Sequence, residues 1–131
     1  MSKSNKPLVY LSVEQVLLLH EIALKYGGGA KGVRDEKVLE SAVMAVQATF
    51  EGKLLHETIE EVASAYLYYL CQNHPFADGN KRTAILAALS YLDWHEVTLK
   101  ASVSELEHLV LSVSQGVFLK KDIVKFFRQK I

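Results

Sequence analysis

A helix-capping signal stands directly before three apolar segments of the chain, and it limits the fold more than any other local pattern. Each signal is a serine or threonine followed three positions later by glutamine or glutamate, at residues 12–15, 58–61 and 102–105. The hydroxyl of the first residue can accept a hydrogen bond from the backbone of the fourth, whose side chain returns one to the first. Because apolar residues at helical spacing follow each signal, the sequence predicts helices that begin at these three points.

Three more helices are predicted between and after these. Asp35 can cap a helix that frays before Gly52. The segment from Arg82 to about Trp94 is apolar on nearly every side, as expected of a helix inside a bundle. Residues 120–130 form a last, basic helix with an apolar face. We therefore expect the all-α class, a compact bundle of about six helices in which the fourth is central.

Length and composition limit the class of protein. The length of 131 residues suits a single domain, 1–131, in which we expect residues 1–7 to form a flexible N-terminal tail. Fifteen basic and fifteen acidic side chains give a net charge of zero, so direct nucleic-acid binding is not expected. Apolar runs such as Ala84 to Leu89 are too short to cross a membrane, and the first residues lack the apolar core of a signal peptide. With Cys71 as its lone cysteine, the chain is expected to be cytoplasmic and to have no membrane partner.

One predicted loop concentrates reactive side chains. It reads HPFADGNKRT, from His74 to Thr83, and lies between the third and fourth predicted helices. The imidazole of His74 can accept a proton near neutral pH, so it is a candidate general base. The carboxylate of Asp78 is a hard oxygen ligand that suits a divalent cation.

The second half of the loop is typical of an anion site. Gly79 can adopt backbone angles that aim successive N–H groups at an anion, and Asn80 tolerates the same left-handed region. Lys81 and Arg82 add positive charge at the predicted start of a helix, where the helix dipole already favours anions. Together with His74 as a candidate base, this pattern predicts a site that binds a phosphate group and reacts with it.

Each part of the loop also has a simpler structural interpretation. A histidine before a proline at a helix end is often a local cap, and a Gly-Asn turn before Lys-Arg is often a solvated helix start. Pro75 keeps His74 and Asp78 from sharing a helical face, which argues against a structural metal site between them. The remaining histidines lack metal-ligand spacing and are expected at the surface or at helix edges, namely His20, His56, His95 and His108.

Taken together, HPFADGNKRT and an upstream segment resemble the Fic/Doc family. The upstream match is GVRDEKVLESAV, from Gly32 to Val43, followed by Phe50 and Gly52. In this family a loop between two helices presents a histidine, and a nucleotide lies on the anion-binding turn that follows. Members that transfer AMP usually have glycine where this chain has Lys81 and a second arginine where it has Ile85. The chain is therefore similar to the Doc-type members, which transfer a terminal phosphate instead.

The resemblance implies a role for each residue of the loop. His74 would be the general base toward a target hydroxyl, Asp78 would hold Mg²⁺, and Phe76 would pack into the core and pin the loop. The phosphates of ATP would be cradled by Gly79, Asn80, Lys81 and Arg82, of which Asn80 and Arg82 would also be catalytic. Lys81 would obstruct the α-phosphate position of the AMP-transferring relatives, which places the γ-phosphate beside His74.

The resemblance also implies partners and leaves alternatives open. A Doc-type toxin kinase acts on a protein hydroxyl, and the family suggests translation elongation factor Tu as the target, so that translation is inhibited. Many Fic proteins have serine or threonine four residues before a Glu-Gly pair in an inhibitory helix, whereas Glu51-Gly52 has Gln47 at that position. A separate antitoxin that lays a helix into a groove is therefore expected. The alternatives are a Fic-type adenylyl or other nucleotidyl transferase and a catalytically silent helical module that binds a partner.

Overall fold

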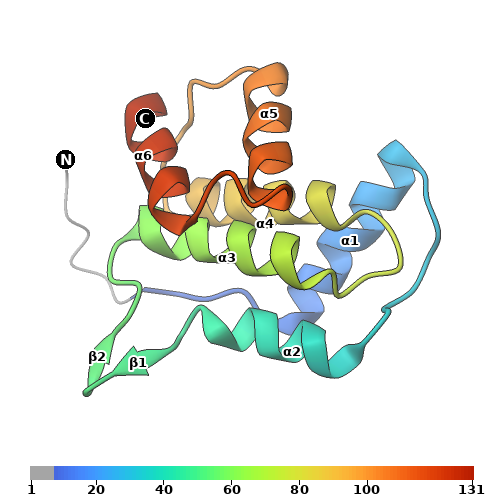
Figure 1. Ribbon diagram of the computed structural model, residues 1–131, viewed down its shortest axis with the longest axis horizontal. Coiled ribbons are helices and arrows are strands. Elements are labelled where there is room, and N and C mark those ends of the chain that lie inside the picture. Colours follow the sequence, from blue (N-terminus) through green and yellow to red (C-terminus); the bar gives the residue numbers. More distant parts are fainter. Residues whose placement is uncertain (1–7) are drawn as a thin grey trace.

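The computed structural model describes residues 8–131, which are mainly helical (Figure 1). The helices in this range are α1 (Val13–Gly27), α2 (Glu36–Ala45), α3 (Ile59–Asn73), α4 (Asn80–Trp94), α5 (Val103–Ser114) and α6 (Lys120–Lys130). Two short strands, β1 (Thr49–Phe50) and β2 (Lys53–Leu54), form an antiparallel hairpin between α2 and α3. The all-α prediction is confirmed, while the predicted tail at residues 1–7 lies outside the described residues.

The three capping signals form as the sequence predicts. The Ser12 hydroxyl accepts a hydrogen bond from the backbone of Gln15 at 3.1 Å, and the Gln15 side chain accepts one from the Ser12 N–H at 2.8 Å. The same two reciprocal hydrogen bonds form between Thr58 and Glu61 at the start of α3 and between Ser102 and Glu105 at the start of α5. Asp35 caps α2 by accepting bonds from two N–H groups of its first turn. These local bonds satisfy backbone groups that a helix start leaves unpaired.

Two local features differ from the prediction. α4 begins at Asn80 rather than at Arg82, because Gly79 takes a left-handed conformation with φ 77° and serves as the N-cap. The hairpin stands where the second helix was expected to fray. Its turn residues Glu51 and Gly52 both have positive φ, 52° and 80°, which a two-residue type I′ hairpin turn requires.

α3 and α4 pack against each other at the centre of the molecule. In Figure 1 they run side by side, with α5 and α6 on one side and α1 and α2 on the other. Both helices contribute buried aromatic and aliphatic side chains to the core, among them Tyr66, Leu67, Leu70, Tyr91 and Leu92. Within residues 8–131, no helix has the length and apolar character that crossing a membrane requires.

Two histidines are buried, contrary to the surface or helix-edge positions that we expected. His20 is 4% exposed and lies on the same face of α1 as the buried Val16 and Ala23. His56 is 5% exposed, and its Nε2 lies 3.0 Å from Lys120 Nζ. Burial lowers the pKa of His56, and the Lys120 ammonium lowers it further. The expectation was wrong because metal-ligand spacing within the sequence carries no information about partners on other helices.

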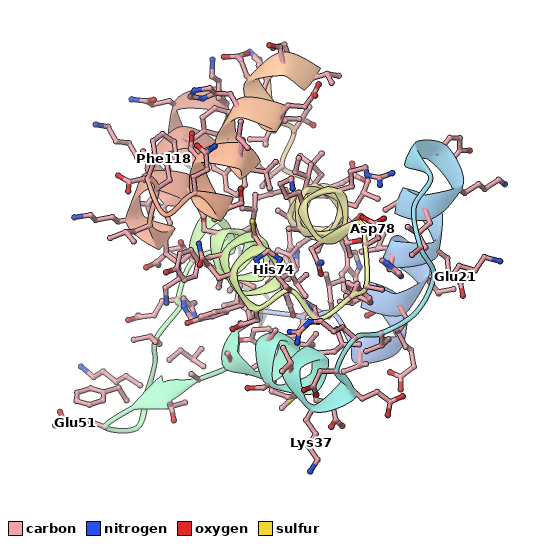
Figure 2. All side chains as sticks on the ribbon, turned by 45° about the vertical axis from the view of Figure 1, so that its right-hand side comes forward. Glu21, Lys37, Glu51, His74, Asp78 and Phe118 are labelled. Atoms are coloured by element: carbon pink, nitrogen blue, oxygen red, sulfur yellow. The ribbon has the colours of Figure 1, made fainter. Side chains whose placement is uncertain are left out.

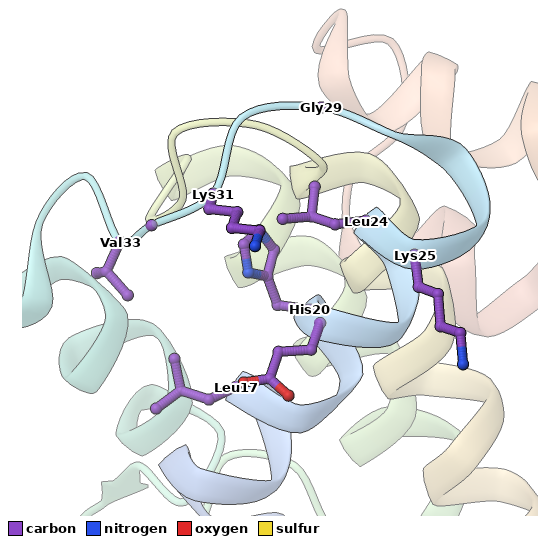
Figure 3. Close-up of a pocket in the computed structure, with 9 residues that line it drawn as sticks. Leu17, His20, Leu24, Lys25, Gly29, Lys31 and Val33 are labelled. Carbon is purple, nitrogen blue, oxygen red and sulfur yellow. The ribbon is translucent and has the colours of Figure 1, made fainter.

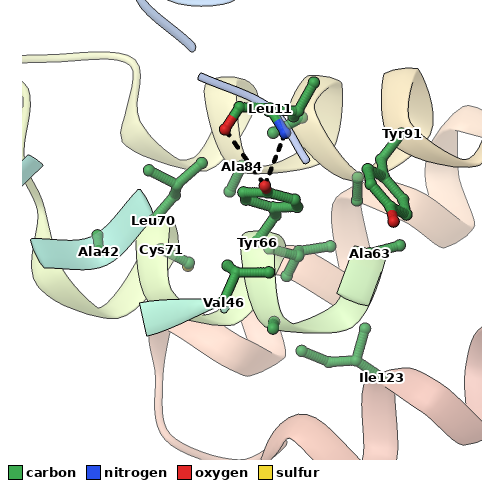
Figure 4. Close-up of a cluster of buried hydrophobic side chains, with 14 of the residues drawn as sticks. Leu11, Ala42, Val46, Ala63, Tyr66, Leu70, Cys71, Ala84, Tyr91 and Ile123 are labelled. Carbon is green, nitrogen blue, oxygen red and sulfur yellow. Dashed lines mark hydrogen bonds between the residues drawn. The ribbon is translucent and has the colours of Figure 1, made fainter. Parts of the chain in front are cut away.

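Two buried tyrosines in the core differ in their hydrogen bonds (Figure 4). The Tyr66 hydroxyl accepts a bond from the Leu11 N–H at 2.8 Å and donates to the Leu11 carbonyl oxygen at 3.4 Å. The neighbouring Tyr91 hydroxyl is buried and has no hydrogen-bond partner within residues 8–131. Burial raises the pKa of Tyr66 to about 12, so this hydroxyl keeps its proton at neutral pH. Tyr66 therefore ties the segment before α1 to α3.

This difference predicts different costs for removing the two hydroxyls. Tyr66→Phe leaves a buried N–H of Leu11 without a partner, which costs about 1–3 kcal/mol of unfolding free energy. Tyr91→Phe removes an unpaired buried hydroxyl and is expected to be neutral or slightly stabilising. Urea denaturation of both variants measures the comparison. Equal losses in the two variants would contradict it.

Candidate active site

The reactive side chains lie on the loop that joins α3 to α4 (Figure 2). His74 is the C-cap of α3 and takes a left-handed conformation, with φ 47° and ψ 56°. Such a conformation is uncommon for a residue other than glycine and costs free energy unless the surroundings hold it. The side chains of His74 and Asp78 are both exposed to solvent. The loop thus presents an imidazole and a carboxylate at one surface of the molecule.

The start of α4 has the backbone features of an anion site. Gly79 is its N-cap, and no side chain caps the N–H groups of the first turn. The Gly79 carbonyl oxygen accepts from both the backbone N–H and the hydroxyl of Thr83, at 2.9 and 2.8 Å, so the first turn is firmly closed. Lys81 is exposed beside these free N–H groups. Uncapped N–H groups, the helix dipole and an ammonium group all favour a negatively charged ligand here.

Asp78 is held by two backbone groups and is ionised. Its Oδ2 accepts a hydrogen bond from Ala30 N–H at 3.1 Å, and its Oδ1 accepts one from Gly79 N–H at 3.1 Å. These bonds hold the pKa of Asp78 below its ordinary value, and the charges of Arg82 and Lys81 act in the same direction. An exposed carboxylate of this kind has lone pairs left for a cation.

The donor set around Asp78 fits Mg²⁺ bound together with phosphates. No group of three or more His, Cys, Asp or Glu side chains within residues 8–131 could hold a metal ion by itself. Mg²⁺ usually keeps several waters and is held by one or two carboxylates plus the phosphates of a substrate. Asp78 is the side chain of this loop that could supply the protein oxygen.

Asn80 and Arg82 make contacts within the protein. The Asn80 amide accepts a bond from the Phe76 N–H at 2.9 Å and donates one to the Phe76 carbonyl oxygen at 3.0 Å, which closes the loop. The Arg82 guanidinium donates to the carbonyl oxygens of Ala23 and Gly28, both at 2.8 Å, at the end of α1. A Cβ on Gly27 would lie 1.3 Å from Arg82 Nη1, so this contact requires glycine at position 27. The structure therefore brings Asp78, the first turn of α4 and Lys81 together, and directs the Arg82 side chain toward α1.

Phe76 anchors the middle of the loop, as predicted. Its side chain is 1% exposed. Its backbone forms an antiparallel bridge with Val33, and Ala77 N–H donates to the Gly32 carbonyl oxygen at 3.0 Å. The segment between α1 and α2 therefore runs along the loop and supplies backbone partners for it.

Arg34 is a residue of this site that the sequence analysis did not single out. Its Nε donates to the His74 carbonyl oxygen at 2.7 Å, and its Nη2 donates to the Asn73 carbonyl oxygen at 3.0 Å. These carbonyls are among those that the end of a helix leaves unpaired. Arg34 thus caps the C-terminal end of α3 and holds His74 in its left-handed conformation. Its position within the GVRDEKVLESAV segment was the signal that could have indicated it.

A cleft of about 640 Å³ lies beside the loop (Figure 3). Lys31 and Val33 line it from the segment between α1 and α2, and α1 contributes a mixed apolar and polar wall of Leu17, His20, Glu21, Leu24 and Lys25. The Oδ2 atom of Asp78 lies close to the backbone of Gly29 at the cleft, 2.8 Å from where a Cβ would stand. A cleft of this size is in the range of those that bind small ligands.

Comparison with known proteins identifies the family. The model of the Fic/DOC family matches residues 10–92, which is more than half of the chain. The chain belongs to the Fic/Doc family. It is 41% identical over 92 residues to "Toxin Doc" of Mycolicibacterium smegmatis, an alignment that covers 70% of this chain and 68% of that protein. It is 32% identical over 110 residues to "Protein kinase doc" of Escherichia phage P1, covering 82% of this chain and 83% of that protein. The matched Fic/Doc region contains α1, α2, α3 and most of α4, and therefore the whole loop with its partners.

The contacts of Arg34 give a testable prediction. Arg34→Ala removes two hydrogen bonds to exposed helix-end carbonyls, so we expect a modest loss of unfolding free energy, about 1 kcal/mol. We expect a larger local effect, with faster hydrogen exchange of the amides of His74, Phe76 and Ala77, because His74 is no longer held. Arg128→Ala, at an exposed position on α6, is the matched control. Unchanged exchange in the loop of Arg34→Ala would contradict the role given to this residue.

Proposed function

We propose that this protein is a Doc-type toxin kinase that transfers the γ-phosphate of ATP to a hydroxyl group of a protein. The observation that carries the proposal is the loop between α3 and α4, which sets an exposed histidine and an ionised aspartate beside the uncapped start of a helix. The relation to "Protein kinase doc" of phage P1 supports phosphate transfer as the reaction. We propose elongation factor Tu as the target, with inhibition of translation in the cytoplasm as the result.

Each residue of the loop has a place in this reaction. The target hydroxyl oxygen attacks the γ-phosphorus as the bond to the bridging oxygen of ADP breaks, and His74 takes the proton of the hydroxyl. The uncapped N–H groups of Asn80 and Lys81 and the Lys81 ammonium stabilise the charge on the phosphates, while the backbone of Gly79 allows them to approach. Mg²⁺ held by Asp78 would neutralise further charge on these oxygens. Arg82 binds the phosphates in this proposal, and its guanidinium then leaves the carbonyls of α1.

Lys81 and Ile85 favour phosphate transfer over AMP transfer. Lys81 is exposed within the first turn of α4, at the position where the AMP-transferring relatives have glycine. Ile85 is half-buried and packs against the core, so an apolar side chain stands where those relatives have a second arginine. A catalytically silent binding module is disfavoured because His74 is exposed and is held in a strained conformation by Arg34.

ATP labelled at either the α- or the γ-phosphate distinguishes these reactions. Incubation of the purified protein with elongation factor Tu, Mg²⁺ and each form of ATP should transfer the γ-label alone. His74→Ala should reduce transfer on the order of a hundredfold or more, because the general base is lost. His108→Ala, at an exposed position on α5, is the matched control and should retain activity. Transfer of the α-label would indicate a nucleotidyl transferase, and transfer of neither label would favour the binding module.

We also propose that an antitoxin helix binds the apolar groove between α1, α4 and α5. The groove has a volume of about 530 Å³ and is lined mainly by apolar side chains, among them Ile22, Tyr26, Ile85, Leu86, Leu89, Val103 and Leu106. Tyr26 and Val103 are 81% and 73% exposed, which is unusual for such large apolar residues. An amphipathic helix that lays its apolar face into such a groove would cover them.

One substitution on α5 tests this groove. Leu106→Asp places a charge among its apolar side chains and should weaken antitoxin binding at least tenfold, as measured by calorimetry. Leu111→Asp introduces the same charge at an exposed position of α5 outside the groove and should leave the affinity unchanged. Equal effects of the two substitutions would place the antitoxin elsewhere.

A further inference from the structure

α1 carries a buried histidine, His20, that packs against the loop between α3 and α4. The ring of His20 stacks on the ring of Phe76, with 3.8 Å between centroids and 6° between planes. Its Nε2 lies 2.8 Å from the carbonyl oxygen of Asp78. A Cβ on Gly79 would lie 3.7 Å from His20 Cδ2 and from His20 Nε2, so the loop backbone packs directly against the imidazole. One side chain thus contacts three residues of the loop.

The hydrogen bond to Asp78 fixes which nitrogen of His20 carries hydrogen. A carbonyl oxygen only accepts hydrogen bonds, so Nε2 must be the donor. The imidazole therefore acts as a hydrogen-bond donor to a single backbone oxygen, that of Asp78, which lies 58 residues further along the chain. A leucine or phenylalanine at this position would fill the same space, but would leave that oxygen without its partner.

This oxygen belongs to the peptide group that orients the Asp78 carboxylate. The carbonyl of Asp78 and the N–H of Gly79 are part of one planar unit, so they point in opposite directions and turn together. The Gly79 N–H donates to Asp78 Oδ1 at 3.1 Å. When His20 fixes the carbonyl, it also fixes this N–H, and with it the carboxylate at the point where the anion-binding turn begins.

We propose that His20 is a positioning residue for phosphate transfer. It sets the plane of the peptide group between Asp78 and Gly79 and thereby orients the Asp78 carboxylate. The effect on the reaction rests on the kinase activity proposed above, whereas the effect on the loop does not. Residues that orient a ligand or a catalytic group from behind typically change activity 10- to 100-fold when they are removed. His20 is expected to act at this level, because misplacement of the carboxylate slows the transfer step and leaves the binding of the target protein unchanged.

Three substitutions separate the hydrogen bond from the packing. His20→Gln places an amide N–H near the position of Nε2, His20→Asn places one near the position of Nδ1, and His20→Phe keeps the ring stack and removes the donor. We expect kcat for γ-phosphate transfer to fall about 10- to 100-fold in the Phe and Asn variants, with an unchanged KM for the target protein. The Gln variant should remain within about threefold of the wild type, because an uncharged donor in the same place restores the bond.

A second readout needs neither ATP nor the target. Hydrogen exchange of the Gly79 amide in the ligand-free protein should be about tenfold faster in the Phe and Asn variants than in the wild type and the Gln variant. Circular dichroism checks that the helices are retained, and the Gln–Asn comparison still decides if the Phe variant does not fold. Equal behaviour of Phe and wild type, or an equal loss in Gln and Asn, overturns the proposal. If the wild type itself transfers no phosphate, the proposed function fails, and the exchange rates alone decide whether His20 positions the loop.

Discussion

The loop between α3 and α4 has little regular structure of its own, so its backbone groups must find partners elsewhere. Buried or half-buried backbone groups without partners are costly, and this loop passes directly over the core. Two other parts of the chain provide the partners. The segment between α1 and α2 pairs with Pro75, Phe76 and Ala77, and α1 supplies His20 for the carbonyl of Asp78. The rest of the fold can be understood as the scaffold that brings these two elements to the loop.

This dependence connects the stability of the fold to the chemistry of the site. His74 is held in a left-handed conformation by Arg34, and Asp78 is held ionised by Ala30 and Gly79. A group that is already oriented loses less entropy when a substrate binds, so in the proposed reaction each of these contacts would favour transfer without touching the substrate. The Arg82 guanidinium is the exception. It closes the end of α1 in this structure, and a role in phosphate binding requires it to exchange these carbonyl partners for the ligand.

The sequence predicted the features that depend on neighbouring residues. The capping pairs at 12–15, 58–61 and 102–105 involve positions three apart, and the order of helices follows from them. The buried place of Phe76 was also predicted. The burial of His20 and the role of Arg34 were not, because their partners lie 58 and 40 residues away and no local spacing reveals them. The hairpin at Thr49–Leu54 was missed because two-residue strands show no alternating pattern. Asn80 and Arg82 are residue types suited to phosphate, but the directions of their side chains depend on contacts with Phe76 and the end of α1.

We propose that this loop is a preorganised binding site for the phosphates of ATP with Mg²⁺. Titration of ¹⁵N-labelled protein with Mg²⁺ and ATP, followed by NMR, tests it most directly, because each backbone amide reports on its own surroundings. We expect the largest shifts at the amides of Gly79, Asn80 and Lys81, and we expect these shifts to weaken when Mg²⁺ is chelated. Shifts confined to the groove between α1, α4 and α5, with residues 78–82 unchanged, would contradict it.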